Sequence, residues 1–286
     1  MTDPEPLMTR ALVLGGGGLA GIAWELGIFA GLADAGVDVT AADLVVGTSA
    51  GSVVGAQIMS GATIGALFDQ QLVPAEQTKE RAVDFDMEKL AEIFGALVGA
   101  TGDNRTAALA AVGAKALTAK TISETDRLEI IASRLASHEW PARRFLATAV
   151  DVHTGEFRAF DSSSGVRLLD AIAASCAVPG VWPPVTIGST RYMDGGVRSG
   201  TNSDLAVGHA RVLILAPLPG AIGPSLDDEV ATLEAGASAV YVIRADEPST
   251  RAISTNPLDP ATRAPSAVAG RAQGMAVADA VRAFWG

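Results

Sequence analysis

Short apolar runs alternate with longer helical stretches along the chain, and tight turns separate them. The first run, residues 10–14, predicts a strand that leads through consecutive glycines into a helix over residues 20–34. The second run, residues 43–46, leads through another glycine-containing turn into a helix that continues to about Ser60. Two consecutive units of strand, turn and helix are typical of parallel strands joined by right-handed crossovers.

The middle of the chain, residues 69–140, has helical periodicity, mixed charge and no convincing strand. It forms either a cap over a ligand site or a set of packing helices, and periodicity does not distinguish the two. Further strands are predicted at residues 144–152, 156–160, 191–193, 211–215 and 239–244, and further helices at residues 166–177 and 264–284. We therefore expect an α/β fold with a mostly parallel sheet, in one domain over residues 10–286 after a flexible N-terminus at residues 1–9.

A candidate nucleophile lies where the second predicted strand ends. Ser49 stands between Gly47 and Gly51 in a G-x-S-x-G pattern, directly before a predicted helix. A serine on a sharp strand-to-helix turn presents its hydroxyl outward, and flanking glycines remove the side chains that would collide around such a turn. Because ligands of parallel sheets bind at the carboxyl ends of the strands, Ser49 lies where a substrate is expected.

The glycine run after the first strand admits two mechanisms. Gly16, Gly18 and Gly21 fit the dinucleotide fingerprint G-x-G-x-x-G. That fingerprint requires an acidic residue at the end of the second strand, whereas Asp38 precedes this strand, so a nucleotide cofactor is disfavoured. Alternatively, the amides around Gly16, Gly17 and Gly18 form an oxyanion hole, or the turn serves only close packing.

A nucleophilic serine needs a base, and the chain has three histidines, His138, His153 and His209. A triad of Ser49, Asp194 and His209 can be written, but it fits the α/β-hydrolase pattern poorly. We therefore expect the histidines to be ordinary surface residues.

Asp194 is the better candidate base. It ends a predicted strand, and Gly195 and Gly196 follow it and permit a close turn against another loop. General base catalysis requires hydrogen-bond reach more than a particular residue type, and burial raises the basicity of a carboxylate. The competing interpretation is an ordinary turn aspartate, which is the commonest role of Asp-Gly.

Composition excludes several classes of protein. A net charge of -11 argues against nucleic acid and against electrostatic attachment to anionic lipid surfaces. Cys176 is the only cysteine, which excludes an internal disulfide and a thiolate metal cluster and favours a cytoplasmic location. Residues 11–31 are nearly uncharged, but Glu25 and consecutive glycines disfavour a membrane-spanning helix there. The excess of Arg over Lys and the abundance of Ala are typical of a GC-rich bacterial genome.

Together, these motifs resemble the patatin-like phospholipase family. The family's glycine-rich loop, G-x-S-x-G turn and D-G-[GA] turn correspond in order to Gly16-Gly17-Gly18-Leu19-Ala20-Gly21, Gly47-Thr48-Ser49-Ala50-Gly51 and Asp194-Gly195-Gly196. Less specific similarities are the residues 151–155, the loop at residues 174–184, and Asn202 after the third motif. The resemblance covers residues 12–215.

The resemblance implies a three-layer α/β/α fold and a Ser-Asp dyad, with Ser49 as nucleophile, Asp194 as base and the amides around Gly16, Gly17 and Gly18 as oxyanion hole. The implied reaction is hydrolysis of lipid acyl esters, by a phospholipase A-like enzyme or a neutral lipid esterase, through an acyl-serine. It implies no metal or organic cofactor, and a lipid or other acyl-ester substrate. Transient membrane contact at a peripheral location is compatible with it.

One departure concerns the glycine loop, where the family commonly has Arg or Lys and this chain has Ala20. The missing charge predicts weaker recognition of a phosphate head group and favours neutral lipid esters. A lipid-binding or regulatory module with the same fold and little turnover is the alternative, although Ser49 and Asp194 favour an enzyme. A dinucleotide-binding protein is a weaker alternative.

Overall fold

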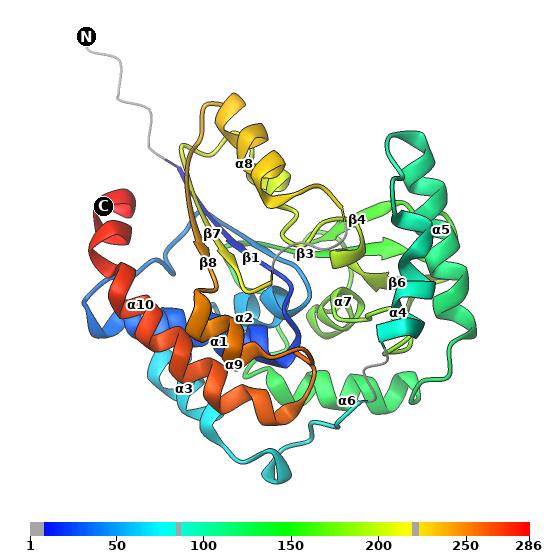
Figure 1. The fold of residues 1–286 in the computed structure, drawn as a ribbon, viewed down its shortest axis with the longest axis horizontal. Coiled ribbons are helices and arrows are strands. Elements are labelled where there is room, and N and C mark those ends of the chain that lie inside the picture. Colours follow the sequence, from blue (N-terminus) through cyan, green and yellow to red (C-terminus); the bar gives the residue numbers. More distant parts are fainter. Residues whose placement is uncertain (1–8, 84–86, 219–222) are drawn as a thin grey trace.

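A computed structural model describes residues 9–83, 87–218 and 223–286, and there a mostly parallel β-sheet lies between two layers of helices (Figure 1). The described strands are β1 (Arg10–Leu14), β2 (Leu44–Gly47), β3 (Arg144–Asp151), β4 (Phe157–Phe160), β5 (Val185–Ile187), β6 (Thr190–Asp194), β7 (Arg211–Ala216) and β8 (Ala239–Arg244). Parallel strands follow one another in the order β3, β2, β1, β7 and β8. This arrangement confirms the predicted three-layer α/β/α fold. Of the predicted flexible N-terminus, residues 1–8 lie outside the described residues.

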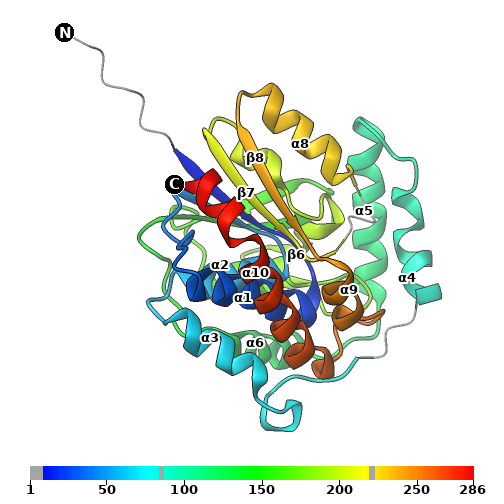
Figure 2. The ribbon, with the colours of Figure 1, turned by 60° about the vertical axis from the view of Figure 1, so that its left-hand side comes forward.

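The alternating direction of side chains along each strand explains why helices pack on both faces of the sheet. Leu12 and Leu14 belong to one buried cluster, which contains residues of α1, α2, α7 and α10, whereas Ala11 and Val13 belong to a second cluster with Leu233 of α8. Successive side chains of a strand point to opposite faces, so a continuous apolar run supplies both faces of a buried sheet. Figure 2 shows α8 and α10 on opposite sides of β7 and β8. The described helices are α1 (Gly18–Asp34), α2 (Ala50–Ile58), α3 (Ile64–Leu72), α4 (Met87–Phe94), α5 (Asp103–Thr118), α6 (Glu124–Arg134), α7 (Leu168–Ser175), α8 (Leu226–Ala235), α9 (Glu247–Ile253) and α10 (Arg263–Trp285).

Helix α1 is apolar because it is buried on nearly all sides. It packs closely against α10, and Gly31 and Gly274 permit this contact: a Cβ on either would lie within 2.4 Å of a carbonyl oxygen of the other helix. Glu25 of α1 is fully buried, and desolvation raises its pKa well above the usual range. No helix in the described ranges is both long and apolar enough to cross a membrane.

The stretch 69–140 is helical, as predicted, with no strand among its described residues; residues 84–86 lie outside them. Its helices fall into two groups. Residues of α4 and α5, including Ile93 and Val112, pack against Val150 of β3 and Met193 of β6. Helix α6 instead lies over the carboxyl ends of the central strands. Its Arg127 and Arg134 line the same cavity as Ser49, which follows the carboxyl end of β2.

The predicted set does not contain β5, α8 or α9, nor the first half of α3. Strand β5 begins directly after Pro184, where the expected proline-rich loop ends, in a segment with no predicted element. Helix α9 lies between the strand predicted at residues 239–244 and the helix predicted at residues 264–284, in a segment expected to be a loop rich in Pro, Ser and Thr, and that expectation was wrong at residues 247–253. Asp246 caps α9 by accepting a hydrogen bond from the Ser249 amide, and a proline occupies its first turn. Cap and proline are a helix start signal, which the loop-like composition obscured.

Candidate active site

Strand β3 brings the two candidate residues together along one of its edges. Its first half pairs with β2, so that Gly47 lies opposite Ala147. Its second half pairs with β6, so that Asp194 lies opposite Ala149, while β4 pairs along the opposite edge. Because β2 runs parallel and β6 antiparallel to β3, the carboxyl ends of β2 and β6 meet about 7 Å apart along β3. The turn that carries Ser49 therefore begins next to Asp194.

Ser49 has a backbone conformation that few residues adopt. Its φ of 52° and ψ of -114° lie outside the regions favoured by L-amino acids, and it immediately precedes α2. Such strain persists only where the surroundings enforce it. A Cβ on Gly51 would lie 2.1 Å from the Leu14 carbonyl oxygen, and one on Gly47 would lie 2.5 Å from the Ser52 Cα, so both flanking positions require glycine. This is the strand-turn-helix geometry of a nucleophile elbow.

The elbow is held by the end of α7. The amide of Ser49 donates a hydrogen bond of 3.0 Å to the Ser175 hydroxyl, and the Cys176 thiol donates to the Ser49 carbonyl at 3.3 Å. The Ser52 hydroxyl donates to the same carbonyl at 2.7 Å. These contacts fix the backbone of Ser49 and leave its hydroxyl for other interactions. The thiol of Cys176 is buried, and burial raises its pKa, so it acts here as a neutral donor.

Asp194 is 4% exposed, and burial raises its pKa to about 7, although the Ser49 hydroxyl, the Gly196 amide and the charge of Arg127 each act to lower it. The Gly196 amide donates to Oδ1 at 2.7 Å. Oδ2 has no hydrogen-bond partner of good geometry among the described residues. The Ser49 hydroxyl is thus close enough to Asp194 to lower its pKa, but it does not form a hydrogen bond of good geometry with Oδ2.

A buried polar network joins the serine turn to the aspartate turn. The side-chain amide of Asn202 donates to the Thr48 hydroxyl at 3.0 Å and to the Gly195 carbonyl at 3.2 Å. Thr148 of β3 donates to the Thr48 hydroxyl at 3.1 Å, and a Cβ on Gly195 would lie 2.3 Å from the Thr148 hydroxyl. This network sets the separation of Ser49 and Asp194. The sequence indicated Asn202 only as a weak similarity, and no motif marked Thr148.

The glycine run reaches the same place. A Cβ on Gly16 would lie 3.6 Å from the Ser49 Cβ, which shows how close the loop comes. The Gly16 amide donates to the Gly200 carbonyl at 2.9 Å, so it is already occupied. The amides of Gly17 and Gly18, at the start of α1, have no acceptor among the described residues. The loop thus presents two amides of the predicted three. Gly21, also predicted to support the motif, packs against Ala50, the residue after the serine.

Ser49 lines a cavity of about 20 Å³, which is room for roughly one water molecule. Apolar walls come from Ile22, Trp182 and Leu258, and the amide end of α1 contributes Gly18. Helix α6 supplies its two arginines to the same cavity. With these groups in place, the cavity has no room for anything much larger than a water molecule.

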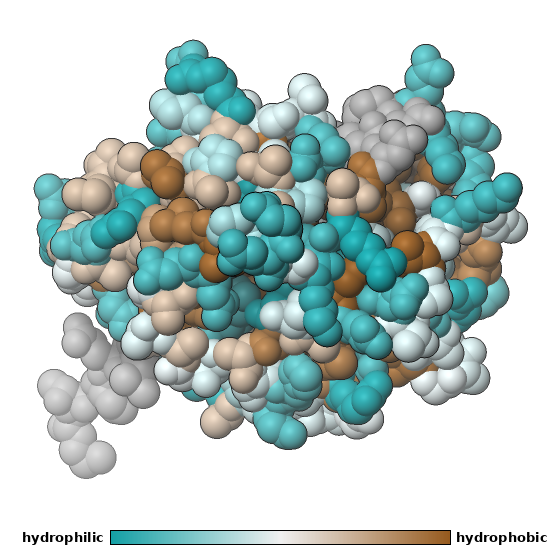
Figure 3. Space-filling model, turned by 90° about the horizontal axis from the view of Figure 1, so that it is seen from below, coloured by the Kyte–Doolittle hydropathy of each residue, from teal (hydrophilic) through white to brown (hydrophobic). Residues whose placement is uncertain are grey.

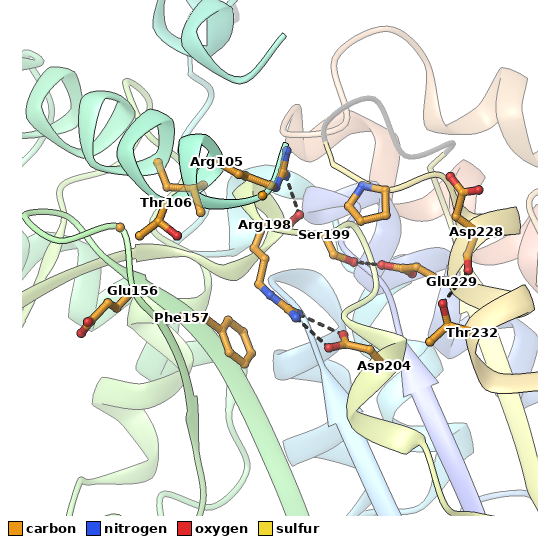
Figure 4. A pocket seen from close by; sticks show the side chains of 14 residues that line it. Arg105, Thr106, Glu156, Phe157, Arg198, Ser199, Asp204, Asp228, Glu229 and Thr232 are labelled. Atoms are coloured by element: carbon orange, nitrogen blue, oxygen red, sulfur yellow. Dashed lines mark hydrogen bonds and ion pairs between the residues drawn. The ribbon is translucent and has the colours of Figure 1, made fainter. Parts of the chain in front are cut away.

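A larger cavity, of about 630 Å³, lies between α5, β4 and α8 and does not include Ser49 or Asp194. Figure 4 shows polar side chains paired with one another along its wall: Arg198 forms an ion pair with Asp204, and the Ser199 hydroxyl donates a hydrogen bond to Glu229. Arg105 also donates to the Arg198 carbonyl at 2.7 Å. These polar groups satisfy one another's hydrogen-bonding capacity. The cavity is larger than the one at Ser49, but its size alone does not make it the reactive site.

None of the three histidines lines the Ser49 cavity. His138 and His153 are exposed. His209 precedes β7, whose Arg211 pairs with Arg10 at the amino end of β1, so it lies a whole strand, about 16 Å, from the serine edge. The triad that includes His209 is excluded by this placement.

The dinucleotide alternative also conflicts with the geometry. The Ala20 amide donates to the Pro257 carbonyl at 3.0 Å, and a Cβ on Gly18 would lie 2.7 Å from the same oxygen. The segment after α9 therefore occupies the side of the helix start at Gly18 and Ala20, which leaves the amides of Gly17 and Gly18 without an acceptor in the described chain but narrows the space that a pyrophosphate would need. In the described part of the chain no cluster of His, Cys, Asp and Glu could hold a metal ion.

A three-layer α/β/α sheet with a serine elbow, a neighbouring buried carboxylate and a glycine loop defines the class of protein. The family model described as patatin-like phospholipase matches residues 12–207 of this chain, which therefore belongs to that family. The comparison with curated proteins yields no match.

Among solved structures, the chain is similar to VipD from Legionella pneumophila, with 12% identity and a TM-score of 0.45, covering 96% of this chain and 67% of that chain. It is also similar to the type III effector protein ExoU, with 15% identity and a TM-score of 0.39, covering 94% of this chain and 54% of that chain. The chain thus spans only about half the length of ExoU.

Proposed function

We propose that this protein hydrolyses lipid acyl esters with Ser49 as nucleophile and Asp194 as general base. The observation that carries the proposal is the pairing of a strained serine elbow with a buried aspartate whose Oδ2 has no partner in the described chain and whose pKa is about 7. A base with a pKa near the working pH is both ionised and basic enough to accept a proton. Membership of the patatin-like phospholipase family supports this reaction class.

In the first half of the reaction, the Ser49 oxygen attacks the ester carbonyl carbon while its proton passes to Oδ2 of Asp194. The negative carbonyl oxygen of the tetrahedral intermediate accepts hydrogen bonds from the Gly17 and Gly18 amides. Each such donor is worth about 3 kcal/mol in the transition state. Collapse of the intermediate breaks the ester bond, and the alcohol leaves with the proton held by Asp194.

In the second half, water attacks the acyl-serine while Asp194 accepts its proton, and on collapse of the second tetrahedral intermediate this proton returns to the Ser49 oxygen as the carboxylic acid leaves. The positive end of the α1 dipole adds to the stabilisation of the oxyanion, because Gly17 caps this helix. The buried polar network of Thr48, Thr148 and Asn202 holds base and nucleophile at a fixed separation.

Substrate reaches the site from the side of α3 and α6. A cavity of about 270 Å³ shares Leu19, Ile22 and Arg134 with the Ser49 cavity. Val73, which is 37% exposed, lies at this cavity beside Leu72, which is 40% exposed. The underside of the molecule, where α3 and α6 lie in Figure 1, carries separate apolar patches among hydrophilic ones (Figure 3). Contact with a lipid surface there would be transient, since no continuous apolar face is visible in this view.

The test is hydrolysis of a soluble short-chain ester by the wild type, Ser49→Ala and Ser60→Ala. We expect Ser49→Ala to lower kcat by about 10⁴-fold or more. Ser60→Ala should retain activity, because that hydroxyl bonds only the Gln57 carbonyl and a neighbouring amide at the end of α2. A wild type that folds and hydrolyses no ester would instead support the lipid-binding alternative, and activity that survives Ser49→Ala would refute the assignment of the nucleophile.

A further inference from the structure

Arg127 of α6 is a buried cation that forms no ion pair with any described residue. It is 2% exposed, it lines the Ser49 cavity, and its Nε and Nη1 have no hydrogen-bond partner among the described residues. Burial lowers its pKa to about 9, which still leaves the guanidinium charged at neutral pH. Unpaired donors of a buried charge are unfavourable unless a ligand satisfies them.

The charged groups around Arg127 do not neutralise it. Arg134, one of its neighbours in the cavity, binds Glu80 through two hydrogen bonds of 2.8 and 2.7 Å, so this carboxylate is already engaged. Asp194 attracts Arg127 across the site without making a direct ion pair with it. Two arginines therefore face the cavity, and of these only Arg134 forms a direct ion pair with a described carboxylate.

The guanidinium of Arg127 is also held in place. It stacks on Trp182 with 3.8 Å between its central carbon and the ring centroid. Stacking uses the face of the guanidinium and leaves its edge, which carries the N–H groups, for a ligand. Ser123 caps the helix that carries Arg127, by accepting from the Asp126 amide. The donors are therefore oriented before any ligand arrives.

We propose that Arg127 binds the phosphate of a phospholipid while Ser49 attacks an acyl ester of the same molecule. The inference rests on the proposed hydrolase function and deepens it by naming the head group. A guanidinium edge matches two phosphate oxygens, and in a glycerophospholipid only the glycerol carbons separate the phosphate from the esters. Arg127 thus supplies, from α6, the positive charge that the glycine loop lacks at Ala20.

The test compares fatty-acid release from a phosphatidylglycerol and from a diacylglycerol with identical acyl chains, each in the same neutral detergent micelles. The variants are Arg127→Met, which keeps an unbranched stem over Trp182, and Arg127→Lys, which keeps the charge but loses the planar edge. Arg251→Met is the matched control, since it removes one exposed arginine on α9 that does not line the cavity. The measurement is made at about pH 8, above the pKa of Asp194 and below that of Arg127, and ionisation of the base cancels in the ratio because both substrates use the same base.

We expect Arg127→Met to lower the ratio of kcat/KM for phospholipid over diacylglycerol by about 10- to 100-fold, with Arg127→Lys intermediate and Arg251→Met unchanged. An equal loss on both substrates, or an unchanged ratio, would overturn the inference. So would a wild type that hydrolyses only the diacylglycerol, and that result would leave the proposed function intact. Hydrolysis of neither substrate by the folded wild type would count against the proposed function itself. If Arg127→Met does not fold, the same kcat/KM ratio is measured for Arg127→Lys: a lowered ratio supports the inference, and an unchanged ratio overturns it.

Discussion

Replacing Asp194 with asparagine should stabilise the protein, and by an amount that grows with pH. The asparagine side chain would keep an oxygen acceptor for the Gly196 amide, so the main change is the loss of a buried ionisable group. In the wild type the pKa of Asp194 is about 7, against 3.8 for the unperturbed carboxyl. The unfolded chain therefore releases this proton at a lower pH than the native chain does.

Because the native-state pKa is raised, wild-type stability falls as pH rises from about 4 to about 7 and is constant above that range. The difference of 7 - 3.8 = 3.2 pKa units corresponds to about 4 kcal/mol. Asp194→Asn should thus be more stable than wild type by about 4 kcal/mol at pH 8.5 and by about 2 kcal/mol at pH 5.5. Relaxation of the native state on ionisation reduces both differences in stability, but the difference at pH 8.5 remains the larger one.

The assay is urea unfolding of both proteins at the two pH values, read by intrinsic tryptophan fluorescence and by circular dichroism. Coincident transitions establish that a single free energy of unfolding describes each curve. The reasoning would be refuted by a stability gain that is equal at the two pH values or larger at pH 5.5. Either result would mean that Asp194 ionises in the native state with an ordinary pKa.

Three further predictions concern the same site. For hydrolysis of a neutral ester, kcat/KM should rise with pH around a midpoint near 7, since ionised Asp194 is the base; a midpoint near 4 in a pH-rate profile would contradict this. Asn202→Ala should lower kcat by about 100-fold with little change in KM, because it loosens the contact between the two turns; steady-state kinetics test it, and unchanged kcat would exclude the positioning role. Gly51→Ala should destabilise by about 3 kcal/mol or more, because its Cβ would overlap the Leu14 carbonyl. Gly65→Ala, where nothing lies within 4 Å of the added Cβ, is the control in thermal unfolding and should be neutral or stabilising by up to about 1 kcal/mol.

Local pattern predicted much of the fold. Parallel strands such as β1 and β7 are short apolar runs, and burial on both faces makes such runs easy to recognise. The stretch around α9 was misjudged, because proline and small polar residues are common in loops and also in helix starts. Helix α1 resembled a membrane span, since burial between a sheet and α10 selects the same apolar residues.

The candidate site was only partly accessible from the sequence. Ser49 and Asp194 follow strands and stand beside glycines, so local context marked both. Their proximity depends on β6 pairing with β3 just beyond β2, and the sequence contains no local signal for that pairing. Arg127 is harder still, because a charged residue in an amphipathic stretch is normally expected at the surface. Only the packing of α6 over the strand ends buries it.

The central claim is that Ser49 is the nucleophile and Asp194 its base. It is tested most directly by reacting a fluorophosphonate probe with the wild type, Ser49→Ala and Asp194→Asn and mapping the modified peptide by mass spectrometry. We predict one adduct on Ser49 in the wild type, no adduct in Ser49→Ala, and labelling slowed by about 100-fold or more in Asp194→Asn. Labelling that persists in Ser49→Ala, or a rate that is unchanged in Asp194→Asn, would contradict the account.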